Sequence, residues 1–158
     1  MQTKELLFFD LKDRVPNDSV LSLKQSLENA GEDKLERLIL LNLKNPILAL
    51  VLSLFLGFLG IDRIYKGDFK LGALKFFLFA TILILFVFLT LLSYSLLGDY
   101  MDYTKEEATI SLFASPLLLA VFMLGLFFLL LIWSVIDIFL VFFGIKKDNL
   151  KKILEILS

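Results

Sequence analysis

Long stretches without a charged residue are the feature that most constrains what this chain can fold into. No Asp, Glu, Lys or Arg occurs from Pro46 to Ile61, from Phe76 to Gly98 or from Ala108 to Ile136, and these runs hold 16, 23 and 29 residues. About 20 apolar residues cross a bilayer core of roughly 30 Å as a helix. Hydrophobic residues fill 58% of the 158 positions, more than the roughly 45–50% of a soluble domain. The pattern predicts an integral membrane protein.

The predicted fold class is all-α. We expect an integral membrane helical hairpin or bundle with about three membrane helices and a short N-terminal helical segment. The predicted domains are an N-terminal soluble or interfacial segment, a membrane domain and a basic amphipathic C-terminal tail, over residues 1–45, 46–145 and 146–158. The predicted membrane helices cover residues 46–61, 69–97 and 116–143.

The first of these helices is short. At 1.5 Å per residue it reaches only about 24 Å. It must therefore thin the bilayer, be extended by residues 38–43, or stop before it has fully crossed.

Several local signals place the ends of the helices. Asn45 and Pro46 are a favoured helix start, Ser115 and Pro116 are a second one, and Gly144 fits a helix stop. Before Asn45, helical spacing of leucines predicts two short helices, and we expect this small hairpin to lie against the membrane. Residues 4–12 fit a strand or a helix. The tail carries an apolar face that suits a membrane surface, formed by Leu150, Ile153, Leu154 and Leu157.

Small residues recur along the first membrane helix. Ala49, Ser53 and Gly57 are spaced four apart, and Gly60 continues the series. Such a stripe lets helix backbones approach closely in lipid. Packing within this chain is the favoured interpretation, ahead of a dimer interface.

Asp137 is the single charge inside the last apolar stretch, about 10 Å from the expected helix end at Gly144. An acid at the centre of a membrane helix costs roughly 2.5–3.5 kcal/mol, so the position demands a partner or a proton. Arg63 is one candidate because its guanidinium can hold a carboxylate with two hydrogen bonds, and Lys75 is the other. Trp133, one turn earlier on the same face, could stack on either cation.

The basic residues near the membrane ends favour one orientation. Eight Lys and Arg lie on the side of the 61–70 loop and the C-terminus, and four lie on the other side: Lys34, Arg37, Lys44 and Lys105. The positive-inside rule then places that loop and the C-terminus in the cytoplasm. The N-terminal segment would lie outside unless the short first helix does not fully cross.

The string from Ser53 to Tyr65, together with Trp133 and Asp137, resembles the TM-two domain family, a pair of membrane helices joined by a short loop with an Asp-Arg-Phe motif. Here the motif is Asp62, Arg63 and Ile64, followed by Tyr65. The stretch before Lys44 is similar to the N-terminal part of bacterial members, and we expect a multi-pass protein of the cell (inner) membrane. Relative to the family, residues 80–125 look like an inserted hairpin, and Ile64 replaces the aromatic ring.

The resemblance implies signalling or protein interaction and brings no catalytic residues. We therefore expect a non-enzymatic membrane module whose partners are the bilayer and other membrane proteins or copies of itself. The alternative is a subunit of a small oligomeric transporter or channel. The chain has no Cys and no His, so we expect no catalytic residues, no metal and no cofactor. The net charge of −1 makes nucleic acid an improbable partner.

Overall fold

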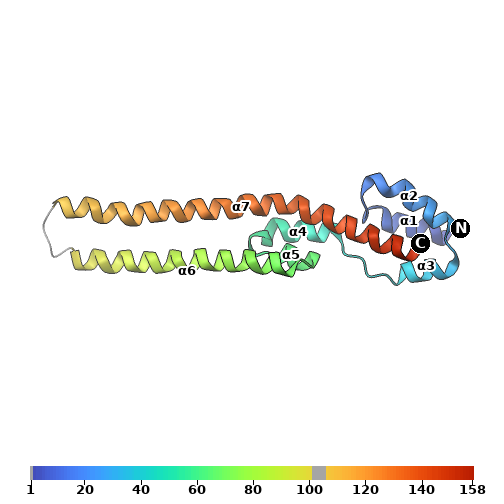
Figure 1. The fold of residues 1–158 in the computed structure, drawn as a ribbon, viewed down its shortest axis with the longest axis horizontal. Coiled ribbons are helices and arrows are strands. Elements are labelled where there is room, and N and C mark those ends of the chain that lie inside the picture. Colours follow the sequence, from blue (N-terminus) through green and yellow to red (C-terminus); the bar gives the residue numbers. More distant parts are fainter. Residues whose placement is uncertain (1, 101–105) are drawn as a thin grey trace.

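The computed structural model describes residues 2–100 and 106–158, and within them every regular element is a helix (Figure 1). Two long helices lie side by side, a short pair of helices packs between them at one end, and a small helical module sits beyond that end. The elements in chain order are α1 (Gln2–Lys12), η1 (Asn17–Ser19), α2 (Val20–Asn29), α3 (Glu32–Ile39), α4 (Pro46–Leu56), η2 (Gly57–Leu59), α5 (Ile61–Lys66), α6 (Phe69–Tyr100) and α7 (Glu106–Leu157).

The N-terminal module consists of α1, α2 and α3 packed around the C-terminal end of α7. Leu11, Leu23 and Leu38, one from each helix, share a buried core with Ile153 of α7. Leu150 and Leu157 of α7 pack against the same core. Three of the four residues of the apolar face that we expected on a membrane surface therefore cover the N-terminal helices, and Leu154 remains 41% exposed. Leucines on an amphipathic helix pack equally well against protein. Residues 4–12, ambiguous in the sequence, are helical in α1.

The chain enters the membrane domain at a well-formed helix start. The side chain of Asn45 accepts hydrogen bonds from the backbone N–H of Ile47 (2.9 Å) and Leu48 (3.4 Å), and Pro46 occupies the first turn of α4. This start agrees with the prediction from Asn45 and Pro46. Asn45 and Pro46 suit this position because the first N–H groups of a helix have no partner within it: the asparagine accepts from two of them, and the proline has no N–H.

The predicted helix 46–61 and the predicted polar loop 61–70 are wrong in detail. Helix α4 ends at Leu56, and after η2 the chain continues in the opposite direction as the short helix α5. The two ends of this segment lie together: Lys44 Nζ donates to the carbonyl of Lys66 (2.6 Å), and the Asn45 N–H donates to Tyr65 Oη (2.9 Å). Residues 46–66, called here the short hairpin, thus begin and end at the same end of the molecule.

The turn of the short hairpin depends on Gly60. Its φ of 74° is left-handed, a conformation in which a side chain is strained. A Cβ on Gly60 would also lie 2.3 Å from the carbonyl oxygen of Gly72 in α6. Two glycines therefore let the backbone of the turn touch the backbone of the next helix.

Helices α6 and α7, called here the long hairpin, contain the two segments long and apolar enough to cross a membrane, Phe69–Leu92 and Ala120–Leu157. The prediction is about three membrane helices; among the described residues two meet this length, and the apolar stretch Pro46–Leu59 is shorter. The start predicted at 116 and the stop predicted at Gly144 are also wrong. Helix α7 is continuous from Glu106 to Leu157.

Both errors have a physical reason. Pro116 lies inside α7, and a proline is tolerated inside a membrane helix because neighbouring groups and local backbone adjustments satisfy the carbonyl that it leaves free. Gly144 lies against the side chain of Lys66, with its Cβ position 2.6 Å from Cε, so this glycine is at a packing contact inside the helix and not at a helix end.

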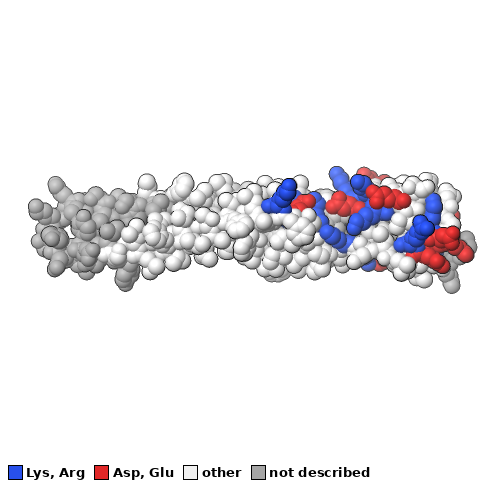
Figure 2. Space-filling model, turned by 60° about the horizontal axis from the view of Figure 1, so that its bottom comes forward, with Lys and Arg blue, Asp and Glu red and all other residues white. Residues whose placement is uncertain are grey.

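Charged side chains gather over the end that holds the short hairpin and the N-terminal module, and the described part of the long hairpin beyond it is white in this view (Figure 2). The N-terminus and C-terminus lie at this same end (Figure 1). Of the two alternatives left open by the sequence, this arrangement favours a short first helix that does not fully cross, because the short hairpin begins and ends at the same end of the molecule.

Candidate functional site

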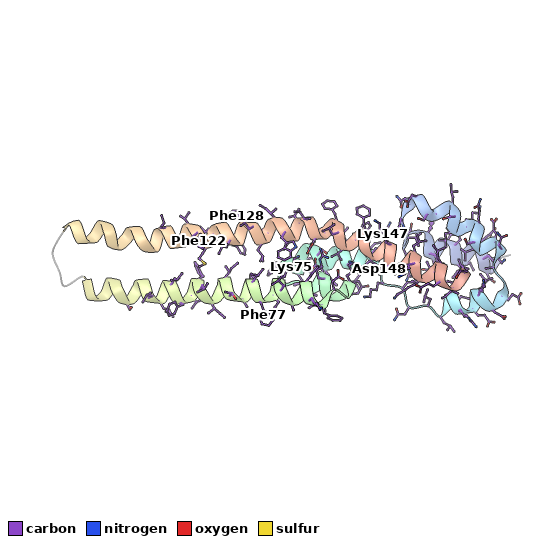
Figure 3. The ribbon with its side chains drawn as sticks, viewed as in Figure 1. Lys75, Phe77, Phe122, Phe128, Lys147 and Asp148 are labelled. Carbon is purple, nitrogen blue, oxygen red and sulfur yellow. The ribbon has the colours of Figure 1, made fainter. Side chains whose placement is uncertain are left out.

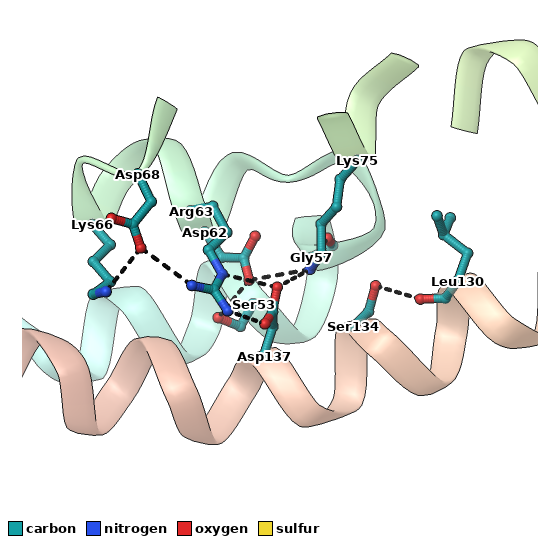
Figure 4. A network of polar contacts seen from close by, with 10 residues as sticks. All are labelled: Ser53, Gly57, Asp62, Arg63, Lys66, Asp68, Lys75, Leu130, Ser134 and Asp137. Carbon is teal, nitrogen blue, oxygen red and sulfur yellow. Dashed lines mark hydrogen bonds and ion pairs between the residues drawn. The ribbon is translucent and has the colours of Figure 1, made fainter. Parts of the chain in front are cut away.

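The candidate site is a network of buried charges where the short hairpin meets α6 and α7 (Figure 4). At its centre, Asp137 of α7 contacts both of the cations considered for it. Arg63 of α5 holds Asp137 with two hydrogen bonds, Nε to Oδ2 (3.0 Å) and Nη2 to Oδ1, and Lys75 Nζ contacts Oδ2. The side chain of Asp137 is fully buried. The two alternatives open in the sequence are therefore both present in the geometry.

Lys75 ties three elements together. It projects from α6 toward the short hairpin and α7 (Figures 3 and 4), and its side chain is fully buried. Besides Asp137, its Nζ donates to the carbonyl of Gly57 (3.2 Å) and lies 3.8 Å from Asp62 Oδ2. It also lies 5.5 Å from the centre of the Trp133 ring, a cation–π distance. Of the two cations, Trp133 therefore faces the lysine.

Asp62 is buried as deeply as Asp137 but is held much less firmly. Its Oδ2 accepts a hydrogen bond from Ser53 Oγ (3.4 Å), and its Oδ1 is buried without a hydrogen-bond partner among the described residues. Burial raises the pKa of Asp62 above its ordinary value, and the charge of Lys75 opposes part of this rise. The sequence analysis treated Asp62 only as part of an exposed loop motif and missed this position.

Asp68 closes the network at its rim. It accepts hydrogen bonds from Lys66 Nζ (2.8 Å) and from Arg63 Nη1 (3.2 Å), and the bond from Lys66 holds its pKa below the ordinary value. The hydrogen bond to Asp137 is the main reason why the pKa of Arg63 is raised. Arg63 thus bridges a half-exposed acid and a buried one.

The buried part of the network is electrically balanced, with Arg63 and Lys75 against Asp62 and Asp137. Taking charges out of water is costly, and each charge is tolerated only because the others are close. Removing one partner of a buried pair typically costs 3–5 kcal/mol, roughly, since it leaves the other charge uncompensated. The network therefore locks the short hairpin, α6 and α7 into one arrangement.

The predicted packing residues lie at contacts within the chain. Ala49 packs with Val141 and Ile145 of α7, and a Cβ on Gly57 would lie in ordinary contact with Ser134 of α7, 3.7 Å away. Ser53 reaches Asp62 and Gly60 meets Gly72, as described above. The stripe thus serves the packing of the short hairpin.

The rest of the predicted loop motif lies in α5. Ile64 packs over Gly72, where a Cβ would lie 2.6 Å from its Cγ1, and Tyr65 Oη accepts the hydrogen bond from Asn45. Ile64 is 40% exposed, so the position of the family's aromatic ring points partly outward. In the described part of the chain, neither side chain forms a hydrogen bond with the charged side chains of the network.

Residues 42–92 match the model of the TM2 domain, the TM-two family that the motif resembles. These residues form a TM2 domain. The matched range contains the short hairpin and the first part of α6, with Asp62, Arg63 and Lys75. Trp133 and Asp137 lie outside it, so the TM2 domain supplies both cations of the network and α7 supplies the central acid. No curated protein and no solved structure matches this chain.

Asn149 is a second residue that the sequence analysis missed. It is 1% exposed, its Oδ1 accepts from the Lys44 N–H (3.3 Å), and its Nδ2 donates to the carbonyls of Lys44 (2.8 Å) and Arg14 (3.1 Å). It therefore fixes the linker before α4 and the end of α1 to α7. Its spacing of four from both Ile145 and Ile153 marks it as a member of the buried face, and this signal was available in the sequence.

Proposed function

We propose that this TM2 domain membrane protein is a non-enzymatic module for protein interaction or signalling in the membrane. The proposal rests on a contrast: the buried charges are paired within the chain, whereas among the described residues large apolar surfaces of α6 and α7 are exposed and contact no other part of it. Every charged side chain of the buried network has a counter-ion within the chain, which leaves the apolar faces of α6 and α7 as the surface offered to other molecules.

The outer surface of the long hairpin supports an interaction role. Phe77 of α6 and Phe128 of α7 are at least 60% exposed, and Phe77 projects from the side of α6 that faces away from α7 (Figure 3). Lipid tails are as apolar as these rings, so the surface can exchange lipid for the helix of another protein at little cost. The partner is a membrane protein or a second copy of this chain.

The topology that follows from this proposal places both termini in the cytoplasm. With the short hairpin returning to its own side, Lys34, Arg37 and Lys44 join the eight basic residues already counted with the C-terminus. Of the twelve, only Lys105 falls between the far ends of α6 and α7. The positive-inside rule then favours the orientation with this end in the cytoplasm, and no basic N-terminal segment has to lie outside the cell.

A crosslinking experiment tests the interaction role. The chain has no cysteine, so a single one can be introduced as Phe77→Cys on the exposed face of α6. If the partner is a second copy, oxidation in native membranes is expected to give a disulfide-linked dimer. If the partner is another protein, a bifunctional thiol reagent is expected to give a larger adduct. Met123→Cys is the matched control, because Met123 is buried between α6 and α7. Monomer alone at Phe77 and at other exposed positions of the long hairpin would contradict the proposal.

A flux assay separates this proposal from the transporter or channel alternative. A pore needs polar groups facing a shared path, and the cavity between α6 and α7 is lined only by apolar residues, from Phe79, Ile82, Leu83, Phe86, Ala120, Met123, Leu124 and Phe127. Liposomes that contain only this protein are therefore expected to be no more permeable to Na⁺, K⁺ or protons than empty liposomes. Flux that depends on the protein would favour the alternative.

A further inference from the structure

A hollow of about 310 Å³ lies where α7 leaves the short hairpin and enters the N-terminal module. Four lysines line it, Lys44 from the linker before α4, Lys66 from the end of α5, and Lys151 and Lys152 from α7. Two acids, Asp148 and Glu155, also contribute. The lining therefore carries an excess of positive charge from three separate segments of the chain. This set of residues is called here the lysine hollow.

The shape of the lysine hollow is held in place by buried groups. Asn149, which lines it, is almost fully buried and fixes the Lys44 backbone through both its N–H and its carbonyl. Lys66 packs the end of its side chain against Gly144, and its carbonyl accepts a hydrogen bond from Lys44 Nζ. A ligand would thus meet a preformed wall and would lose little free energy in ordering it.

Two of the four ammonium groups are free to bind a ligand. Lys66 Nζ already pairs with Asp68, and Lys44 Nζ donates to a carbonyl. Lys151 and Lys152 are exposed, and in the described part of the chain neither forms an ion pair or a hydrogen bond through Nζ. With four lysines against two acids in the lining, and with two of the lysines outside any ion pair, the hollow favours an anion.

The lysine hollow also lies at the level of the lipid headgroups. Ile47 in the first turn of α4, Phe69 at the start of α6 and Phe143 within α7 are exposed apolar residues, and we place the edge of the hydrocarbon core at them. Lys44 and Lys66 come directly beside this edge, and Lys151 is about 12 Å beyond Phe143 along α7. Headgroups extend roughly 5–7 Å from the hydrocarbon on each side, and a lysine stem of about 6 Å bridges the remainder.

We propose that the lysine hollow binds the phosphate of an anionic phospholipid headgroup from the adjoining leaflet. Lys151 and Lys152 supply the free charges, and Lys44 and Lys66 form the side nearest the hydrocarbon. Basic pockets beside membrane helices suit such headgroups, and each lysine near an anionic surface strengthens binding several-fold. A soluble phosphate compound shares the same chemistry, so the experiment must distinguish the two sources.

The test compares two variants that remove the same charge from the same helix. The double variant Lys151→Gln, Lys152→Gln removes the two free charges of the lysine hollow. The control, Lys146→Gln with Lys147→Gln, removes two charges that are nearer the membrane but do not line the hollow. Purified full-length protein is incubated with phosphatidylglycerol or phosphatidylcholine of equal chain length, and retained lipid is counted by native mass spectrometry. In a second arm, inorganic pyrophosphate is titrated into protein held in phosphatidylcholine nanodiscs.

The expected result is a preference for phosphatidylglycerol that falls about tenfold in the Lys151/Lys152 variant and less than about threefold in the control. Pyrophosphate binding that depends on Lys151 and Lys152, without a preference for phosphatidylglycerol, would overturn the lipid assignment in favour of a soluble phosphate. An equal loss in both variants would show attraction to general surface charge and would overturn the site. The absence of both lipid preference and pyrophosphate binding would do the same.

Discussion

The two ends of the long hairpin are held together by different kinds of interaction. At the end that holds the short hairpin, α6 and α7 are joined by buried charges, by a backbone contact between glycines and by small residues. Toward the far end, most of the described side chains are apolar and many are exposed, and a cavity of about 220 Å³ separates the helices. The near end therefore specifies one arrangement, whereas the far end is held mainly by its continuity with the near end.

The difference has a physical origin. Apolar side chains contribute little to helix association in lipid, because lipid tails solvate them as well as a neighbouring helix does. Charges and close backbone contacts are specific, since lipid cannot replace either. The near end should therefore respond strongly to small substitutions, and the far end should tolerate larger ones.

Removal of the central acid is expected to have the largest effect. In Asp137→Ala, Arg63 keeps only the half-exposed Asp68 and Lys75 keeps only Asp62, 3.8 Å away, so the loss of stability should be about 3–5 kcal/mol. Trp133 is the single tryptophan and lies beside Lys75, so its fluorescence reports on the network during unfolding in detergent.

The matched control is Asp148→Ala on the same helix. Asp148 is exposed and forms no ion pair among the described residues, so its loss should change stability by less than about 0.5 kcal/mol. Equal effects of the two substitutions would mean that the buried network does not hold the near end together.

The second largest effect is expected for a glycine-to-alanine substitution at the near end, compared with the same substitution toward the far end. Gly60→Ala introduces a Cβ at a φ of 74° and 2.3 Å from the Gly72 carbonyl oxygen, and the strain should cost about 2–4 kcal/mol. Gly125→Ala adds a methyl group to open space in α7 and should be neutral or stabilise the helix by up to about 1 kcal/mol. Thermal unfolding in detergent measures both, and similar melting temperatures for the two variants would contradict the comparison.

The parts of the near end that could be predicted from the sequence are those with a local cause. An acid in a long apolar stretch requires a cation, and Arg63 and Lys75 were the two basic residues that could reach Asp137. The start of α4 at Asn45 and Pro46 follows equally from local chemistry. The matched TM2 range could be predicted as well, because its motif is contiguous from Ser53 to Tyr65.

The direction of the short hairpin could not be predicted in the same way. Hydropathy measures how apolar a segment is and contains no information about where the chain goes next. The turn exists because Gly60 and Gly72, 12 positions apart, touch through their backbones, and this contact is visible only in three dimensions. Likewise, the apolar face around Ile153 suits a membrane or a protein core, and the sequence alone does not distinguish them.

A smaller effect should separate a buried apolar residue at the near end from an exposed one at the far end. Val141 is fully buried against Ala49, so Val141→Ala should cost about 1–2 kcal/mol through the cavity that it leaves. Phe122 is 59% exposed on α7, and Phe122→Ala should change stability by less than about 0.5 kcal/mol although it deletes more atoms. Chemical unfolding in the same detergent compares them. A greater loss at Phe122 would show that the far end is held by side-chain packing after all.

The smallest effect is expected for the second buried acid, and its sign depends on pH. Because the pKa of Asp62 is raised by burial, the folded state holds this proton more tightly than the unfolded state does. Asp62 therefore lowers stability at neutral pH, and its contribution becomes more favourable as the pH falls through its raised pKa toward the ordinary value of 3.8. Asp62→Asn keeps the shape without the charge, and should change stability at neutral pH by no more than about 1 kcal/mol.

The decisive measurement is the pH dependence of unfolding above pH 3.8 for the two proteins. Asp68, whose pKa is lowered, acts in the opposite direction, and its contribution is lost only as the pH falls below that value. The original protein should therefore gain stability relative to Asp62→Asn as the pH is lowered from 7 toward 4. A constant difference across this range would mean that Asp62 is fully paired with Lys75, and that the two buried acids of the near end are equivalent.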